Sequence, residues 1–325
     1  MRRCGCGNIS RLSTKSVSTS TPPSPLTGLV AATHTPFHAD GSLNVGAVEK
    51  QAAHLLGDGV STVFIGGTTG ESHSLSLEER RALAQRWTEV AHGTPMRVIV
   101  HVGANCLEDA RALATQAEQL GAIAISALSP SYFKPRDVPT LVACAAHIAA
   151  AAPQTPFYFY DIPPFTGVSL SMPDFLAQAR DRIPTLAGLK FSNSDLLSFQ
   201  LCLHADGGRW TLPFGCDEFL LAALALGATC AVGSTYNFAA PIYTRLIAAF
   251  ARGDLATARE EQFRSARLVQ LLAGYGFMGA AKALMEMRSV PVGPARLPHT
   301  NPPPEQTAKL RGELEALGFF DWIRR

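Results

Sequence analysis

The sequence is poor in charge and lacks long hydrophobic runs. Only 17% of its 325 residues are charged, against about 25% in ordinary soluble proteins, so much of the chain is expected to lie in a core. No apolar run reaches the ~18 residues that span a bilayer, and we expect no membrane partner. The chain is long enough to bury a large interior. Because 47% of its residues are hydrophobic and only 17% are charged, disordered, collagen-like and coiled-coil proteins are excluded.

The body of the chain also lacks an excess of positive charge. Residues 1–25 hold four basic residues and no acid, which leaves 24 bases against 26 acids for the other 300 residues. This net charge of −2 gives no electrostatic footprint for nucleic acid or an anionic membrane, so we expect neither as a partner. Residues 1–25 are rich in Ser, Thr, Pro and Arg, and are expected to be a disordered tail or targeting segment outside the fold.

Several motifs of common chemistries are missing. The nine histidines never take HxH or HExxH spacing, so a zinc-dependent enzyme is disfavoured and we expect no metal. The Gly-x-Ser-x-Gly elbow of serine hydrolases does not occur. The seven cysteines are odd in number and form no CxxC pair, which favours reduced thiols in a cytoplasmic protein over a disulfide framework.

What the sequence does contain is a regular alternation of short apolar runs and helical stretches. The apolar runs predict strands buried on both faces, at residues 29–33, 62–65, 98–102, 123–128, 157–160, 186–191, 210–214 and 230–232. One of the helical stretches between them begins with the capping box Ser76–Glu79. Eight strand–helix units predict a (β/α)8 barrel over residues 26–235, because open doubly wound sheets usually stop near six strands. Only helical patterns follow, so residues 236–325 are expected to form a C-terminal helical extension.

In such barrels the active site lies at the carboxyl ends of the strands, and Lys190 is the strongest candidate there. It is one of only six lysines and follows the apolar residues 186–189. Burial lowers the pKa of a lysine, and a neutral amine can attack a keto carbon to form an imine. The alternative is a lysine that extends to solvent or pairs with an acid. An isolated lysine would favour that alternative, but the residues at neighbouring strand ends reverse the balance.

Three other strand ends carry polar groups suited to the same chemistry. Thr68 and Thr69 offer hydroxyls and backbone N–H groups to a carboxylate, although an ordinary Gly/Thr turn has the same composition. Tyr160 ends its strand and is either a proton-transferring phenol or a core aromatic with one hydrogen bond. Asp217 and Glu218 either cap the helix that follows them or bind substrate hydroxyls.

These residues resemble the dihydrodipicolinate synthase/N-acetylneuraminate lyase family. The resemblance rests on Gly-Thr-Thr-Gly-Glu at 67–71, Tyr-Asp-Ile-Pro-Pro-Phe-Thr-Gly at 160–167 and Gly-Leu-Lys at 188–190, and extends from about residue 26 to the end. Members of the family are class I, Schiff-base aldolases on a (β/α)8 barrel with a helical extension. Within it, residues 29–33 and 227–237 are similar to the animal-type lyase branch.

The resemblance implies a role for each candidate residue. Lys190 would form the imine with C2 of the substrate, and Tyr160 would move the proton at the C4 hydroxyl. Thr68 and Thr69 would bind the pyruvoyl carboxylate and orient the tyrosine. Tyr132 matches an aromatic residue that some members lend across a subunit interface, and the family implies a homotetramer. Positions that contact the hydroxyl tail of the sugar are matched by Ser192, Gly215, Asp217, Glu218 and Ser234.

Three residues depart from the family pattern. Phe165 stands where the synthases have an arginine that holds the carboxylate of a second substrate, a contact that an apolar ring cannot make. Asp161 stands where the family usually has Asn or His, and it either shifts the proton affinity of Tyr160 or faces away from it. His73 after the Gly/Thr loop is also unusual, which bears on sugar preference rather than on reaction class.

The resemblance therefore implies reversible retro-aldol cleavage of sialic acid to N-acetylmannosamine and pyruvate, without a metal or organic cofactor. One alternative is another class I pyruvate-dependent aldolase with the same lysine chemistry, acting on a keto-deoxy sugar acid or 4-hydroxy-2-oxoglutarate, or as a dihydrodipicolinate synthase. The other is a non-catalytic barrel that binds a small acid. The presence of Lys190, Tyr160, Thr68 and Thr69 weighs against this last alternative.

Overall fold

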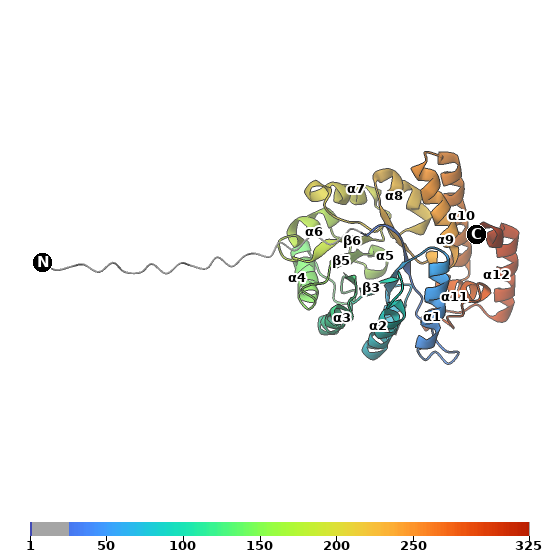
Figure 1. Cartoon of the computed structure of the whole chain (residues 1–325), viewed down its shortest axis with the longest axis horizontal. Helices are drawn as coiled ribbons and strands as arrows, with labels where there is room; N and C mark the ends of the chain where they lie inside the picture. The colour runs from blue at the N-terminus through green and yellow to red at the C-terminus, as the bar shows by residue number, and fades with distance from the viewer. Residues whose placement is uncertain (2–25, 325) are drawn as a thin grey trace.

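The computed structural model describes Met1 and residues 26–324, so the expectation for the segment 1–25 lies, apart from Met1, outside the described residues. Seven parallel strands occupy the centre of the fold, in the order β6-β5-β4-β3-β2-β1-β7 (Figure 1). Each coincides within one residue with a predicted run. The strands are β1 Gly28–Ala32, β2 Thr62–Ile65, β3 Arg97–His101, β4 Ala124–Leu128, β5 Phe157–Asp161, β6 Leu186–Phe191 and β7 Cys230–Gly233.

The prediction of a regular strand over residues 210–214 is wrong, although the segment does close the barrel. Pro213 has no N–H to donate, which interrupts a strand ladder. The carbonyls of Thr211 and Pro213 still accept hydrogen bonds from β6, at 3.2 and 2.9 Å. Phe214 exchanges hydrogen bonds of 3.0 and 2.8 Å with β7. The predicted barrel architecture is therefore confirmed, with an irregular segment between β6 and β7.

Helices surround the strands (Figure 1). The predicted capping box before α2 is confirmed, since Ser76 Oγ accepts from the Glu79 N–H at 3.2 Å and Glu79 accepts from the Ser76 N–H at 2.9 Å. The helices of this part of the chain are α1 Val48–Gly57, α2 Leu77–Ala91, α3 Leu107–Gln119, α4 Val138–Ala149, α5 Pro163–Thr166, α6 Met172–Ala179, α7 Leu196–His204 and α8 Leu220–Leu226.

The strands separate two apolar regions, because successive side chains point to opposite faces. Outward-facing residues such as Val63 and Ile65 pack against the helices. Inward-facing residues such as Phe64, Tyr158 and Tyr160 fill the barrel. Leu189 and Phe191 of β6 belong to the outer set. The alternation therefore places Lys190, which lies between them, in the inner set, where it lines a small void with Phe64 and Tyr158.

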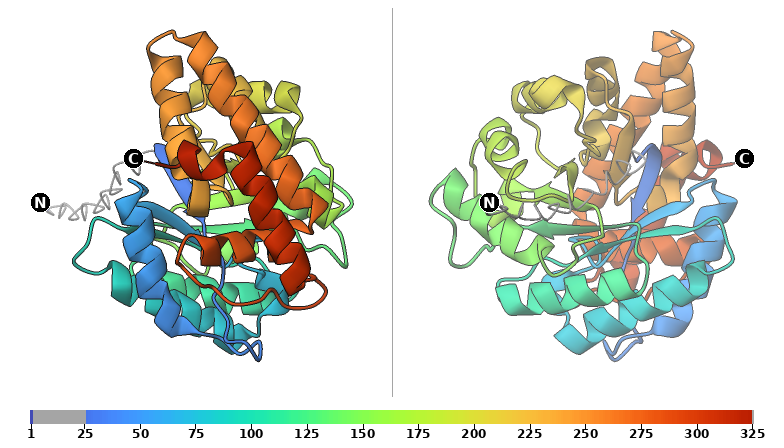
Figure 2. Two further views of the ribbon diagram at one scale, coloured as in Figure 1. Left: turned by 90° about the vertical axis from the view of Figure 1, so that its right-hand side faces the viewer. Right: turned by 60° about the vertical axis from the view of Figure 1, so that its left-hand side comes forward.

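The C-terminal helices gather on one side of the barrel (Figure 2). They are α9 Tyr236–Ala251, α10 Leu255–Gly274, α11 Phe277–Met287, α12 Pro304–Leu317 and α13 Phe319–Trp322. We propose the division that the sequence predicts, into a barrel over residues 26–235 and a C-terminal helical extension over residues 236–325. Helix α9 joins the two parts, because it contacts both β1 and α10. No single helix among the described residues is long and apolar enough to cross a bilayer; α10 and α11 reach that length and composition only together, across a bend of 113°.

Candidate active site

A cavity of about 290 Å³ opens at the carboxyl ends of the strands. The chain brings nine of the ten predicted site residues to it, namely Thr68, Thr69, Tyr160, Lys190, Ser192, Gly215, Asp217, Glu218 and Ser234. Three further lining residues come from the C-terminal helices, Val269 on α10 and Phe277 and Met278 on α11. Nothing in the sequence distinguished these three from ordinary helix residues.

Lys190 lies near the end of β6 with its amine enclosed by aromatic rings. Its side chain is buried, and Nζ lies 3.4 Å from the centre of the Tyr160 ring and 4.6 Å from that of Phe64. Its nearest hydroxyl is Ser192 Oγ, at 3.5 Å. Burial holds the pKa of Lys190 well below its ordinary value, and the negative charge of Asp217 opposes this effect only in part. The amine is thus favoured in its neutral, nucleophilic form.

Tyr160 ends β5 with its hydroxyl beside the Gly/Thr loop. Its phenol oxygen lies 3.2 Å from Thr68 Oγ1. The ring is fixed by edge-to-face contacts with Phe64 and His101, whose centres lie 5.8 and 5.7 Å away. Burial raises the pKa of Tyr160 to about 12, so the phenol stays protonated at neutral pH and can take part in proton transfer only by passing a proton on.

Thr69 and Ser234 connect the ends of the two strands that flank β1. Thr69 Oγ1 and Ser234 Oγ lie 2.6 Å apart, which joins the loop after β2 to the segment after β7. Both residues line the cavity within reach of a ligand beside Lys190. Hydroxyl groups of this kind are suited to donate hydrogen bonds to a carboxylate.

Asp217 presents a buried carboxylate to the other side of the cavity. Its Oδ2 accepts hydrogen bonds from the N–H and hydroxyl of Thr235, at 3.0 and 2.6 Å, rather than capping a helix. Its Oδ1 is buried and has no hydrogen-bond partner in the protein. Burial raises the pKa of Asp217 to about 6. Asp217 also lines the cavity, and a buried carboxylate there is suited to accept a hydrogen bond from a ligand hydroxyl.

Glycine is required where Gly215 approaches Ser192. A Cβ atom at position 215 would lie 1.9 Å from Ser192 Oγ. Any larger residue would therefore push the serine, which lies next to the Lys190 amine.

Across the described residues, no group of three or more His, Cys, Asp or Glu side chains is placed to hold a metal ion.

The chain is similar to known proteins over most of its length. Residues 25–317 match the Dihydrodipicolinate synthetase family. The chain belongs to this family. It is 40% identical to an N-acetylneuraminate lyase of Rattus norvegicus over 93% of this chain and 95% of that protein.

Two solved structures have the same fold. The N-acetylneuraminate lyase of Proteus mirabilis superposes with a TM-score of 0.88 at 40% identity, covering 91% of this chain and 100% of that one. The sialic acid aldolase of Aliivibrio salmonicida also superposes with a TM-score of 0.88, at 42% identity, and the match covers 91% of this chain and 98% of that one. The family resemblance expected from the motifs is thereby confirmed.

Two of the departures from the family pattern now have positions. Phe165 is exposed at the rim of the cavity. Asp161 does not line the cavity, and its Oδ2 instead accepts a hydrogen bond of 3.2 Å from Asn193. Burial raises the pKa of Asp161 to about 6, while its charge has only the smallest of the effects on the pKa of Tyr160. Of the two alternatives, Asp161 therefore faces away.

Tyr132 and His73 lie outside the cavity of this single chain. Tyr132 is 78% exposed and stacks edge-to-face on Phe133 at 5.0 Å. Its implied role in this family needs a second copy of the chain, so it stays a prediction. His73 lines a neighbouring hollow of about 400 Å³ that shares Thr68 and Phe165 with the active-site cavity.

Proposed function

We propose that this chain cleaves N-acetylneuraminate reversibly to N-acetylmannosamine and pyruvate by a Schiff-base retro-aldol reaction. The observation that carries the proposal is the buried, neutral-favoured amine of Lys190, which faces a cavity beside the Tyr160–Thr68 hydroxyl pair. The names of the relatives that are about 40% identical support the choice of substrate. We infer from Phe165 that the cavity does not hold the second carboxylate of a synthase substrate.

The reaction begins when Lys190 Nζ attacks the C2 ketone of the open-chain acid and water leaves, which forms a protonated imine. The electrons of the C3–C4 bond then move toward the imine nitrogen. At the same time the C4 hydroxyl gives its proton to the Tyr160 oxygen, and the phenol passes its own proton through the Thr68 hydroxyl that it contacts to the carboxylate bound beside C2. N-acetylmannosamine departs as the aldehyde, and an enamine remains on the lysine. Return of one proton to C3, followed by hydrolysis, releases pyruvate and the free amine, so protons and electrons balance.

The surrounding residues bind and orient the substrate in this proposal. Thr68 and Thr69 bind the carboxylate next to C2, and Thr68 also orients the Tyr160 phenol, which it contacts at 3.2 Å. Because the pKa of Tyr160 is raised to about 12, the phenol relays the proton and does not hold a negative charge for long. The hydroxyl tail of the sugar is bound by Ser192, Gly215, Asp217, Glu218 and Ser234.

The test is reduction with borohydride in the presence of pyruvate or of N-acetylneuraminate, followed by mass measurement of the intact chain and its peptides. A pyruvate-sized adduct on Lys190 from both compounds is expected. An adduct from pyruvate alone would show that the substrate is another keto acid, which a panel of sugar acids would identify. No adduct from either would leave a non-catalytic acid-binding barrel. Full activity in folded Lys190→Ala would overturn the mechanism.

We also propose that the protein is a cytoplasmic homotetramer. The five cysteines of the described residues are unpaired, as expected in a reducing compartment. The exposed aromatic pair Tyr132–Phe133 provides a surface that a second copy would cover. Sedimentation velocity measures the assembly, and Tyr132→Ala is expected to lower activity when the subunits lend this residue to each other. A monomer with full activity would contradict the proposal.

A further inference from the structure

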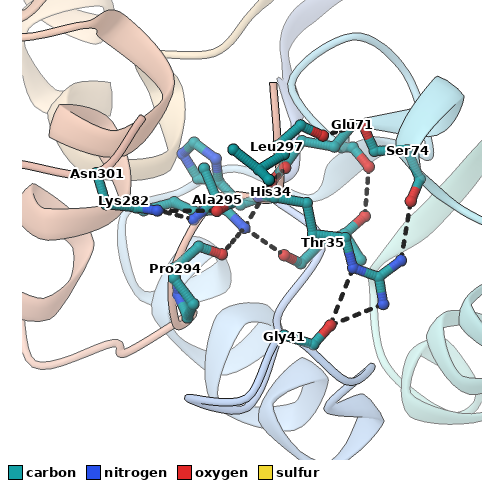
Figure 3. A network of polar contacts seen from close by, with 12 residues as sticks. His34, Thr35, Gly41, Glu71, Ser74, Lys282, Pro294, Ala295, Leu297 and Asn301 are labelled. Atoms are coloured by element: carbon teal, nitrogen blue, oxygen red, sulfur yellow. Dashed lines mark hydrogen bonds and ion pairs between the residues drawn. The ribbon is translucent and has the colours of Figure 1, made fainter. Parts of the chain in front are cut away.

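A buried ion pair joins the loop after β2 to the C-terminal extension. Lys282 Nζ on α11 lies 2.6 Å from Glu71 Oε1, and the two side chains are 1% and 0% exposed. The same amine donates to the carbonyls of Thr35 at 3.0 Å and Pro294 at 2.9 Å, as Figure 3 shows. The ammonium group thus has one carboxylate as its ion-pair partner and two carbonyl oxygens as hydrogen-bond acceptors, which together fix the lysine in one place.

The residues held by this ammonium group in turn hold the loop that carries Thr68 and Thr69. Thr35 Oγ1 donates a 2.6 Å hydrogen bond to the carbonyl of Gly70. Glu71 accepts a second contact, from the Arg296 N–H at 2.8 Å. The two residues that follow Thr69 are thus anchored from a helix more than two hundred positions later in the chain.

The loop needs this anchoring because its backbone is strained and tightly packed. Glu71 has φ of 54°, in the left-handed region, which a residue other than glycine keeps only when its surroundings impose it. A Cβ atom at Gly70 would lie 3.0 Å from the Gly66 backbone and 3.2 Å from the carbonyl oxygen of Thr33. Without the ion pair, Glu71 would relax toward an ordinary conformation and carry the loop with it.

We propose that Lys282 and Glu71 are positioning residues that set the affinity of the active site for the substrate carboxylate. They touch no reacting atom. They act by holding Thr68 and Thr69, whose hydroxyls bind that carboxylate in the proposed function, on which this inference rests. Because small displacements of binding groups cost much of the benefit of a preorganised site, loss of the pair weakens carboxylate binding while leaving the Lys190 amine in place.

The test titrates pyruvate in the borohydride reaction and records two quantities, the half-saturating pyruvate concentration and the plateau of trapped enzyme. The variant is the double substitution Lys282→Met/Glu71→Gln, which removes both charges so that neither is left buried without its partner. The half-saturating concentration is expected to rise about tenfold or more, as the loss of a hydrogen bond to a charged group predicts. The plateau is expected to stay near that of the wild type. A merely structural role would lower the plateau and leave half-saturation unchanged.

A matched control removes another pair that joins the end of α11 to the barrel. Arg288 Nη2 lies 3.0 Å from Asp58 Oδ2, and Arg288→Met/Asp58→Asn is expected to leave half-saturation unchanged. If the double variant of the Lys282 pair does not fold, Thr35→Val carries the test, since it removes only the hydroxyl that holds Gly70. Unchanged half-saturation in the folded variant overturns the inference. Failure of the wild-type chain to trap pyruvate would instead overturn the proposed function.

Discussion

Replacing Lys190 with methionine is expected to abolish imine formation and at the same time to stabilise the fold. The Lys190 amine is buried, and the single hydrogen bond that it makes to the described residues, with Ser192 Oγ, has the long distance of 3.5 Å. Burying a polar group that is poorly hydrogen-bonded costs about 1–3 kcal/mol in proteins. Methionine has a similar length and packs well against aromatic rings. The free energy of unfolding of Lys190→Met should therefore exceed that of the wild type by about 1–3 kcal/mol.

The stability difference between Lys190→Met and the wild type should decrease as pH rises. The pKa of Lys190 in the folded chain lies well below the ordinary 10.5, so between these two values the unfolded chain binds a proton that the folded chain does not. The stability of the wild type therefore rises with pH through this window. Since methionine does not titrate, the advantage of Lys190→Met should be larger at pH 8 than near pH 10.5.

Urea unfolding at fixed protomer concentration measures both effects, because assembly would otherwise shift the midpoint. Lys282→Met is the matched control, since it removes the other buried lysine but leaves Glu71 without its partner. That variant should lose about 3–5 kcal/mol. If Lys190→Met is instead less stable than the wild type at pH 8, the Lys190 amine is a paired ammonium, and the argument for a neutral nucleophile fails.

Four further changes have expected outcomes. Tyr160→Phe should lower kcat about 10²–10⁴-fold while borohydride still traps pyruvate; loss of trapping would contradict a proton-transfer role. Gly188→Ala should cost more than about 3 kcal/mol in thermal unfolding, because φ is +152° and the new Cβ would lie 1.8 Å from a carbonyl oxygen. Burial lowers the pKa of His34 from 6.5 to about 3. The unfolded chain thus binds the extra proton, and stability should fall by up to about 5 kcal/mol as pH drops from 6.5 to 3; His34→Gln should flatten this slope in acid titrations. Asp161→Asn should leave the alkaline limb of the pH–rate profile in place, and a clear shift would show that this carboxylate acts on the phenol.

The strand ends were predictable from sequence because parallel strands align their carboxyl ends at one edge. Once each apolar run is located, the polar residues at its end or shortly after it are expected near the mouth of the barrel. Lys190, Tyr160 and Asp217 were found in this way, from three separate runs. The apolar runs are a strong signal because a strand buried on both faces cannot tolerate polar residues.

Two features were beyond this reasoning. The run 210–214 is as apolar as the others, but Pro213 prevents a regular ladder, and the segment pairs through isolated bridges. Lys282 lies in a helical pattern where a lysine is ordinarily exposed. Its buried partner Glu71 is separated from it by most of the chain, and pairing at that distance leaves no local signal in a single sequence.

The C-terminal extension is part of the active site rather than an addition to the barrel. Its helix α11 contributes Phe277 and Met278 to the cavity. The same helix contributes Lys282 to the ion pair with Glu71, at the end of the loop that carries Thr68 and Thr69. These contributions lie on one helix, so a shift of α11 would change the wall of the cavity and the position of the loop together. A barrel without the extension would leave Glu71 as an uncompensated charge and open the cavity to solvent, and both effects oppose binding of an acid beside a neutral amine. The fold thus ties Lys190 on β6, the proposed nucleophile, to the loop of Thr68 and Thr69, the proposed carboxylate-binding loop, which is held from the far end of the chain.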